Sequence, residues 1–231
     1  MTTYLRNRGI DPWNAEYNVG HQSPEMYGYY AREEDKYFKR DLRATEEFIS
    51  EVVKNNHRPI GVNSSDLVQE IKQLLQEARI EVTNSNFHDI VDATSGRLFI
   101  RAHNGGFGYC VRLVATSCLM DSGTNDYRCA YGLCDNQYHF FWVADASYQA
   151  FTKMQEVYLE DLKMGKEIAA NKELKTIKKF LTRRLIVEIE QLEVEIEAKG
   201  IETIVKERPN LKDIIDNLII IKKEIKQWMN K

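Results

Sequence analysis

The residues best suited to hold a metal are three cysteines and a histidine in the middle of the chain. Cys118, Cys129, Cys134 and His139 follow one another with ten, four and four residues between them, a spacing that matches no common zinc module. When the strands are paired by their turn residues, Cys129 faces one side of a sheet while Cys134 and His139 face the other. Ligands on two sides of a sheet cannot meet one ion, so we expect no metal site, no cofactor, and buried, unreactive cysteines.

Nucleophilic catalysis is a second chemistry that these side chains could perform. Cys110 or Cys118 would supply the thiol, and His139 would supply the base. The sequence around them predicts ordinary strands, with neither a strained nucleophile turn nor a pair of oxyanion donors. We therefore expect no catalytic residue and a protein that binds rather than catalyses, with an enzyme of unrecognised type as the alternative.

Aromatic and basic side chains alternate on one face of the predicted central sheet. Bases stack on aromatic rings and arginines hold phosphates, so this face would suit nucleic acid. The alternative is that a helix covers the rings while the arginine stems lie along the surface and their head groups reach water. The candidate nucleic-acid-binding residues on this face are Arg97, Phe99, Arg101, Arg112, Arg128 and Phe141, and His103 and His139 lie on the same face.

A second basic cluster lies in a long predicted helix nearer the C-terminus. Its members are Lys172, Lys175, Lys178, Lys179, Arg183 and Arg184, with Glu173 as the only acid among them. Five glutamates follow between Glu188 and Glu197 without a base. The basic end could bind phosphate, or the whole helix could pair antiparallel with a second copy. The plainer interpretation is a solvated surface with ion pairs inside the helix.

Turn residues organise the strands that carry these side chains. Asn104-Gly105 predicts a two-residue hairpin turn that pairs Ile100 with Tyr109. A turn at Gly105-Gly106 would keep the same residues on the same face, whereas a slip of one residue would set apolar side chains against polar ones.

A second hairpin is predicted around Asp135-Asn136. It would join strands at 126–134 and 137–145, again with apolar residues opposite one another. Together the two hairpins predict a four-stranded antiparallel meander over residues 97–145, with one strongly apolar face.

Helical periodicity predicts helices on both sides of this meander, at 33–55, 64–78, 151–199 and from Asn210 to the end. Gly165 predicts a bend in the third of these helices, and Gly200 predicts its end. Narrow apolar stripes in the last two helices predict an antiparallel helical hairpin of coiled-coil type, which packs on the core or on a partner. The expected fold class is α+β, with an arm at 1–32, a core domain at 33–150 and the helical hairpin at 151–231.

The first 32 residues show neither helical nor strand periodicity, but they are rich in aromatic residues. Disordered tails usually lack such residues, so we expect an arm that packs on its own domain or on a neighbour. Tyr and Trp are typical anchors of partner surfaces. The candidate protein-binding residues are Trp13, Tyr17, Tyr27, Tyr29 and Tyr30.

Composition limits the function classes further. The 231 residues are 43% hydrophobic and 29% charged, and their net charge of −3 leaves only a local basic surface for nucleic acid. Neither a membrane-length apolar run nor a signal-peptide core is present, so we expect a cytoplasmic protein with no membrane partner.

We expect a non-enzymatic protein-binding or assembly module that engages a protein partner or itself. A viral or mobile-element accessory or structural protein, in the host cytoplasm, would suit this layout. Nucleic-acid binding is the alternative.

Overall fold

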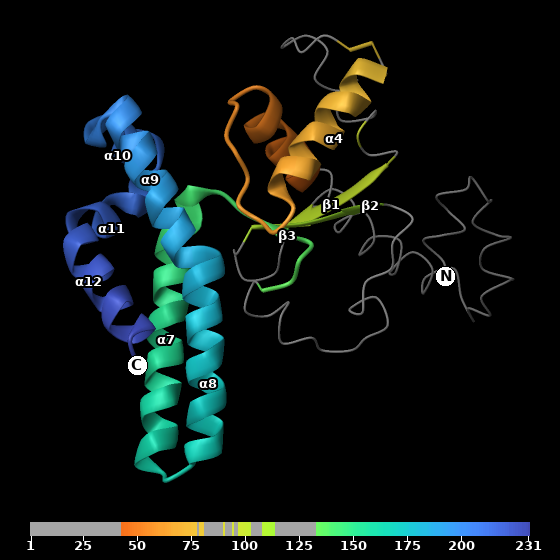
Figure 1. The fold of residues 1–231 in the computed structure, drawn as a ribbon. Helices are drawn as coiled ribbons and strands as arrows, with labels where there is room; N and C mark the ends of the chain where they lie inside the picture. The colour runs from red at the N-terminus through yellow and green to blue at the C-terminus, as the bar shows by residue number, and fades with distance from the viewer. Residues whose placement is uncertain are drawn as a thin grey trace, which may run out of the picture.

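The computed structural model describes residues 43–77, 79–80, 90, 94, 97–102, 108–113 and 133–231 of the chain. The described elements form two groups that lie side by side, as Figure 1 shows. A smaller group of two helices and a sheet encloses one hydrophobic core, and a larger group of helices encloses a second core. The fold is therefore mixed α and β, as the sequence predicts.

The sheet has three antiparallel strands in the order β1-β2-β3, which are Leu98–Ala102, Tyr109–Leu113 and Gln137–Tyr138. One face is apolar, because Leu98, Ile100 and Val111 are buried together. The opposite face carries Phe99 and Arg112, which pair across the two longer strands. The predicted division of side chains between the two faces is therefore confirmed for β1 and β2.

The first hairpin has the register of the second predicted alternative, a turn at Gly105-Gly106. Ala102 pairs with Tyr109, which is the pairing expected of a turn at Gly105-Gly106. A turn at Asn104-Gly105 would pair Ile100 with Tyr109, whereas Ile100 pairs with Val111. That prediction is therefore wrong. Because side chains alternate with a period of two, this shift left the predicted faces unchanged.

The second predicted hairpin is confirmed at its turn but not in its strands. Asp135-Asn136 forms the turn, closed by the N–H of Gln137 donating to the carbonyl of Cys134 at 3.1 Å. The strand predicted at 137–145 already ends at Tyr138. This short strand pairs directly with β2, with Tyr138 opposite Tyr109. In the predicted meander, the neighbour of β2 would be the strand at 126–134 instead. The four-stranded meander is therefore not confirmed, and residues 126–132 lie outside the described part.

The chain leaves the sheet through a run of four apolar residues, 140–143. His139 makes a single antiparallel bridge to Ile60, and Phe141–Val143 then forms the 3-10 helix η2. A short apolar run fits a strand and a buried helix equally well, so its pattern could not exclude the strand.

Two helices cover the apolar face of the sheet. The first spans residues 43–53, and α4 spans Ser64–Glu77. Each buries one stripe of its surface, as predicted. The buried residues from the two helices are Ala44, Thr45, Phe48, Ile49, Val52, Leu67, Ile71, Leu74 and Leu75.

The helix predicted at 151–199 is instead divided at Gly165 into α7, at Ala144–Lys163, and a second helical run that begins with α8, at Glu167–Phe180. Gly165, where a bend was predicted, has a φ of +69° and reverses the chain. The N–H of Lys166 donates to the carbonyl of Asp161 at 2.8 Å and closes the end of α7. A continuous helix through Gly165 is therefore wrong. Figure 1 shows the α7–α8 hairpin projecting away from the sheet.

After α8 the chain continues through a π-helical turn and five short helical segments. They are η3 (Leu181–Leu185), α9 (Ile186–Lys199), α10 (Ile201–Glu207), η4 (Pro209–Leu211), α11 (Lys212–Asp216) and α12 (Leu218–Met229). Gly200 ends α9 as predicted, with a φ of +82°.

The two predicted apolar stripes meet inside the helical group. The buried residues of the first stripe are Leu181, Leu185, Ile189 and Leu192, and those of the second are Leu211, Ile214, Ile221, Ile225 and Trp228. All nine belong to one core, while Ile196 and Leu218, the remaining members of the two stripes, pack at its edge. α12 lies against α7, where Tyr148 donates to Glu224 at 2.9 Å. The stripes are thus satisfied within the chain, and a coiled coil is not confirmed. In the part of the chain that the structure describes, we find no helix long and apolar enough to cross a membrane.

Candidate anion-binding face

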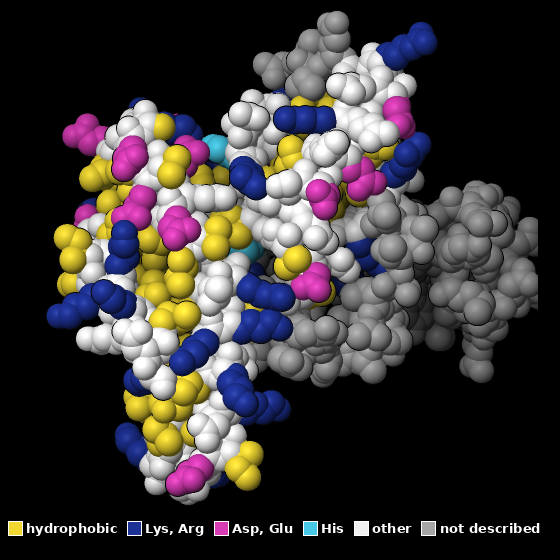
Figure 2. Space-filling model, in the orientation of Figure 1, with side chains coloured by type: hydrophobic (Ala, Val, Ile, Leu, Met, Phe, Trp, Pro, Cys, Tyr) yellow, Lys and Arg dark blue, Asp and Glu magenta, His cyan; other side chains and the backbone are white. Residues whose placement is uncertain are grey.

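The outer face of α8 and η3 carries a row of basic side chains, which we call the basic row: Lys172, Lys175, Lys179 and Arg183. Their spacing of three, four and four residues puts them on one side of the helix, and all four are exposed. Ile177 and Phe180, on the opposite side, are buried in the helical core. The amphipathic pattern thus turns the basic row toward solvent, and Figure 2 shows dark blue side chains over this part of the molecule.

No acidic residue interrupts the basic row within this described stretch. The other residues near this face are Asn171, Thr182 and the half-buried Thr176 and Lys178. The one acid of this stretch, Glu173, is half-buried, and burial and then the negative charge of Asp161 on α7 raise the pKa of its carboxyl. The basic row extends over about 17 Å at about 1.5 Å per residue, so it presents several positive charges to one extended ligand.

At its upper end the basic row reaches a groove of about 370 Å³. One wall is the loop from Arg58 to Ser64, and the other is formed by η3 and the start of α9. We call it the arginine groove, because its two charged lining residues are Arg58 and Arg183. The other lining residues are Pro59, Ile60, Gly61, Val62, Ser64, Thr182, Val187 and Gln191.

Both arginines of this groove are held in place by bonds that leave part of each guanidinium available. Arg58 donates from one Nη to Ser65 Oγ at 2.9 Å. Arg183 donates from Nη1 to the carbonyl of Leu133 at 3.1 Å and to Asp135 at 2.9 Å. A guanidinium has five N–H donors, so each arginine can also bind a ligand oxygen.

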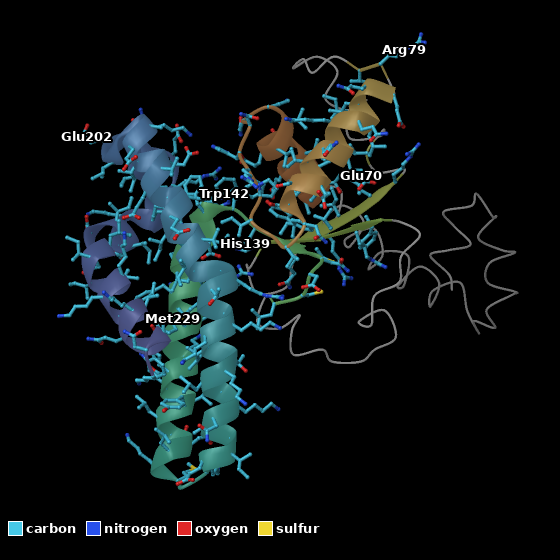
Figure 3. All side chains as sticks on the ribbon, viewed as in Figure 1. Glu70, Arg79, His139, Trp142, Glu202 and Met229 are labelled. Carbon is cyan, nitrogen blue, oxygen red and sulfur yellow. The ribbon has the colours of Figure 1, made fainter. Side chains whose placement is uncertain are left out.

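Arg184, predicted as part of the basic cluster, is not on the basic row. It is fully buried, and its guanidinium lies 3.4 Å from Glu188 Oε1 one turn later. The same oxygen accepts a hydrogen bond from Ser147 at 2.9 Å and lies 2.9 Å from His139 Nε2. Arg184 therefore belongs to a buried cluster that joins the sheet to the helices. Figure 3 shows His139 at this junction.

The electrostatics of this buried cluster follow from its isolation. Burial, and then the positive charge of Arg184, lower the pKa of His139, so its imidazole is neutral at pH 7. Burial alone would raise the pKa of Glu188, but His139, Arg184 and Ser147 outweigh it and lower that pKa. A carboxylate and a guanidinium thus balance each other, and the side chains lie too deep to meet a substrate.

The predicted nucleic-acid face of the sheet is brought together only in part. Two guanidiniums lie near the Phe99 ring, with Arg112 at 4.7 Å and Arg101 at 5.7 Å from its centroid. Phe141 does not belong to this face: it is buried in the helical core, because the chain has left the sheet there. Arg97 is exposed and pairs with Glu77 at 3.3 Å. Arg128 lies outside the described residues.

The predicted protein-binding arm also lies outside the described residues, so Trp13, Tyr17, Tyr27, Tyr29 and Tyr30 stay predictions. The same holds for Cys118 and Cys129 of the rejected zinc set. Within the described ranges, no group of three or more potential ligands is placed to hold a metal ion.

The acidic half of the long helix is partly neutralised within the chain. Glu188 is buried, Glu193 pairs with Lys222 at 2.7 Å, and Glu195 pairs with Lys199 at 2.8 Å. Glu190 and Glu197 stay exposed, so the antiparallel pairing with a second copy stays a prediction, with a reduced acidic surface.

Sequence reasoning missed the arginine groove and the buried cluster. Arg58 is too far from Arg183 in sequence to be grouped with it by any local pattern. The cluster did leave a signal, because Arg184 and Glu188 share the helical face of the apolar stripe, next to Leu181 and Leu185. Comparison with known proteins adds no further assignment: no family model, no curated protein and no solved structure matches the chain.

Proposed function

We propose that this protein binds nucleic acid along the basic row of α8. The observation that carries the proposal is the row itself, in which four exposed basic side chains follow one another on one helix face without an intervening acid. Phosphates repeat along a nucleic-acid strand, so a linear array of cations can contact several of them at once. The whole chain carries a net charge of −3, so binding requires a local basic surface such as this row.

The shape of the α7–α8 hairpin supports this proposal. It projects from the molecule, so a strand can lie along α8 without meeting the sheet (Figure 1). Lysine contacts to phosphates carry no base information, so we expect binding with little sequence preference.

The experiment compares two triple variants that remove the same charge. One is Lys172→Gln, Lys175→Gln, Lys179→Gln. Its control is Lys206→Gln, Lys212→Gln, Lys223→Gln, which changes three exposed lysines on α10, α11 and α12. Fluorescence anisotropy with a labelled 20-nucleotide strand, single or in duplex, should show binding by the wild type at low salt. The basic-row variant should bind at least about tenfold more weakly, and the control should stay within about twofold. No binding by the wild type, or an equal loss in both variants, would contradict the proposal.

A second candidate function, protein binding or assembly, is favoured by the free end of the same hairpin. Five large hydrophobic side chains are exposed there, namely Val157, Leu159, Leu162, Met164 and Ile168. Exposed apolar patches of this kind are typical of protein contacts. A second copy of the chain is the partner that the pure protein can test. Sedimentation velocity would then show a dimer that Met164→Glu with Ile168→Glu dissociates, whereas Ile219→Glu, on α12, does not. A wild-type monomer at every concentration would contradict self-assembly.

A further inference from the structure

We infer that the arginine groove binds a phosphomonoester, and that this group is the terminal phosphate of a strand lying on the basic row. The inference rests on the proposed function for the source of the phosphate, but not for the chemistry of the groove. It assigns a second, more selective site at the upper end of the row.

The lining of the groove has the chemistry of an anion site. Arg58 and Arg183 contribute two guanidiniums from elements that are distant in sequence, and none of the described lining residues is acidic. Ser64, Thr182 and Gln191 add neutral hydrogen-bonding groups. Guanidiniums recognise phosphate oxygens by paired hydrogen bonds as well as by charge, which a row of lysines does not.

The charge of the groove fits a terminal phosphate better than a backbone phosphate. A phosphate bonded to one carbon carries about −1.5 to −2 charges at pH 7, whereas each phosphate within a strand carries one. Asp135 offsets part of the Arg183 charge, but it pairs from an exposed position and contacts only Nη1. Two guanidiniums therefore line the groove, and Asp135 neutralises only part of the charge of one of them.

The size of the groove fits a small group. Its volume of about 370 Å³ lies near the lower end of the roughly 300–1,000 Å³ typical of ligand sites. A phosphate and the first sugar fit this space, and the rest of the strand then leaves toward Lys179 and Lys175, which lie one and two turns away on the same helix face.

The walls of the groove are anchored, so the two arginines do not have to be ordered when the ligand binds. Ile60 exchanges backbone hydrogen bonds with His139 at 2.7 and 3.0 Å. A Cβ at Gly61 would lie 2.5 Å from the Tyr138 ring, so only glycine lets the loop pack here. On the other wall, Val187 directly precedes the buried Glu188. Such preorganisation favours affinity because little conformational entropy is lost on binding.

The test compares strands of one sequence that end in a 5′-phosphate or a 5′-hydroxyl, with a 3′-phosphorylated strand as a third ligand. The wild type should bind one of the phosphorylated strands at least about fivefold more tightly than the unphosphorylated strand. Arg58→Gln should remove this preference and keep the affinity for the unphosphorylated strand. Arg79→Gln, at the far end of α4 in Figure 3, is the matched control and should change neither.

The outcomes separate the two proposals. If the wild type binds all three strands equally, the groove inference is overturned while binding along α8 stands. If no strand binds, but a nucleoside monophosphate shifts the amide NMR signals of Gly61 and Thr182 in wild type and not in Arg58→Gln, the groove is a phosphate site and the nucleic-acid function fails. If a phosphoserine peptide competes as well as the terminal nucleotide does, the nucleic-acid source is overturned in favour of a phosphoprotein.

Discussion

His139 Nε2 lies 2.9 Å from Glu188 Oε1, and neither side chain reaches solvent. His139 ends the sheet, whereas Glu188 lies on α9, so this contact joins the two groups of elements through a buried charged cluster. Buried charges are costly unless they are paired, and here one carboxylate is paired with Arg184 and bonded by Ser147. The junction that shapes one wall of the arginine groove therefore depends on a few polar contacts.

The first prediction concerns Glu188. Glu188→Gln keeps the shape of the side chain but leaves the positive charge of Arg184 buried without a counter-charge. We expect the free energy of unfolding to fall by about 3–5 kcal/mol, measured by urea denaturation. Glu190→Gln, two residues away and exposed, should change it by no more than about 0.5 kcal/mol. Equal effects in the two variants would mean that the cluster does not stabilise the fold.

The second prediction concerns pH. Since burial lowers the pKa of His139 in the folded state, the unfolded chain binds a proton below about pH 6.5 that the folded chain does not. Stability should therefore fall as the pH drops from 7 through 5, by up to about 1.4 kcal/mol per pH unit from this group. Urea midpoints of His139→Gln over the same range should show a shallower fall. A variant with the wild-type slope would assign the dependence to other groups.

The third prediction concerns Glu51, which links the helix at 43–53 to the C-terminal helices. Burial raises its pKa, but His57, Asn55 and Arg208 outweigh this effect and lower the pKa to about 2. A depressed pKa stabilises the fold above about pH 4.5, and this contribution is lost as the pH falls toward 2. A double-mutant cycle of Glu51→Gln and Arg208→Gln should give a coupling of roughly 1 kcal/mol at pH 7. The coupling should decrease as the pH falls toward 2, where Glu51 is about half protonated, and a coupling that keeps its pH 7 value there would contradict the charge pairing.

The fourth prediction concerns Gly200. Its φ of +82° and ψ of 151° belong to a region that only glycine occupies readily, although nothing lies within 4 Å of the position of a Cβ. Gly200→Ala should thus destabilise the protein by about 1–3 kcal/mol through its backbone alone. Ala198→Gly, in the preceding turn of α9, should cost only about 1 kcal/mol. Thermal unfolding of both variants provides the comparison.

The sequence predicted the parts of the fold in which local pattern and tertiary packing agree. The stripes of α4 and α12 and the faces of β1 and β2 followed from periods of 3.6 and two, and the structure buries them as expected. The failures occurred where one pattern fits two structures. The apolar run 140–143 suits a strand or a helix, and a glycine at position 165 permits either a bend or a reversal.

The candidate site was predictable only along one helix. Lys175, Lys179 and Arg183 could be grouped because helical spacing alone brings them together. Arg58 lines the same groove as Arg183 only because the 58–64 segment lies beside η3 and α9, which no sequence pattern encodes. Arg184 is buried because it lies on the apolar stripe, a position that its charge alone does not reveal.

The salt dependence of binding tests the central claim most directly. The logarithm of the association constant falls linearly with the logarithm of the salt concentration. On single-stranded nucleic acid, each lysine that contacts a phosphate should make this slope steeper by about 0.7. Changing Lys172, Lys175 and Lys179 to Gln should reduce the slope by about 2, whereas the control triple on α10, α11 and α12 should leave it unchanged. A slope that is the same in wild type and in both variants would show that α8 does not contact the phosphates.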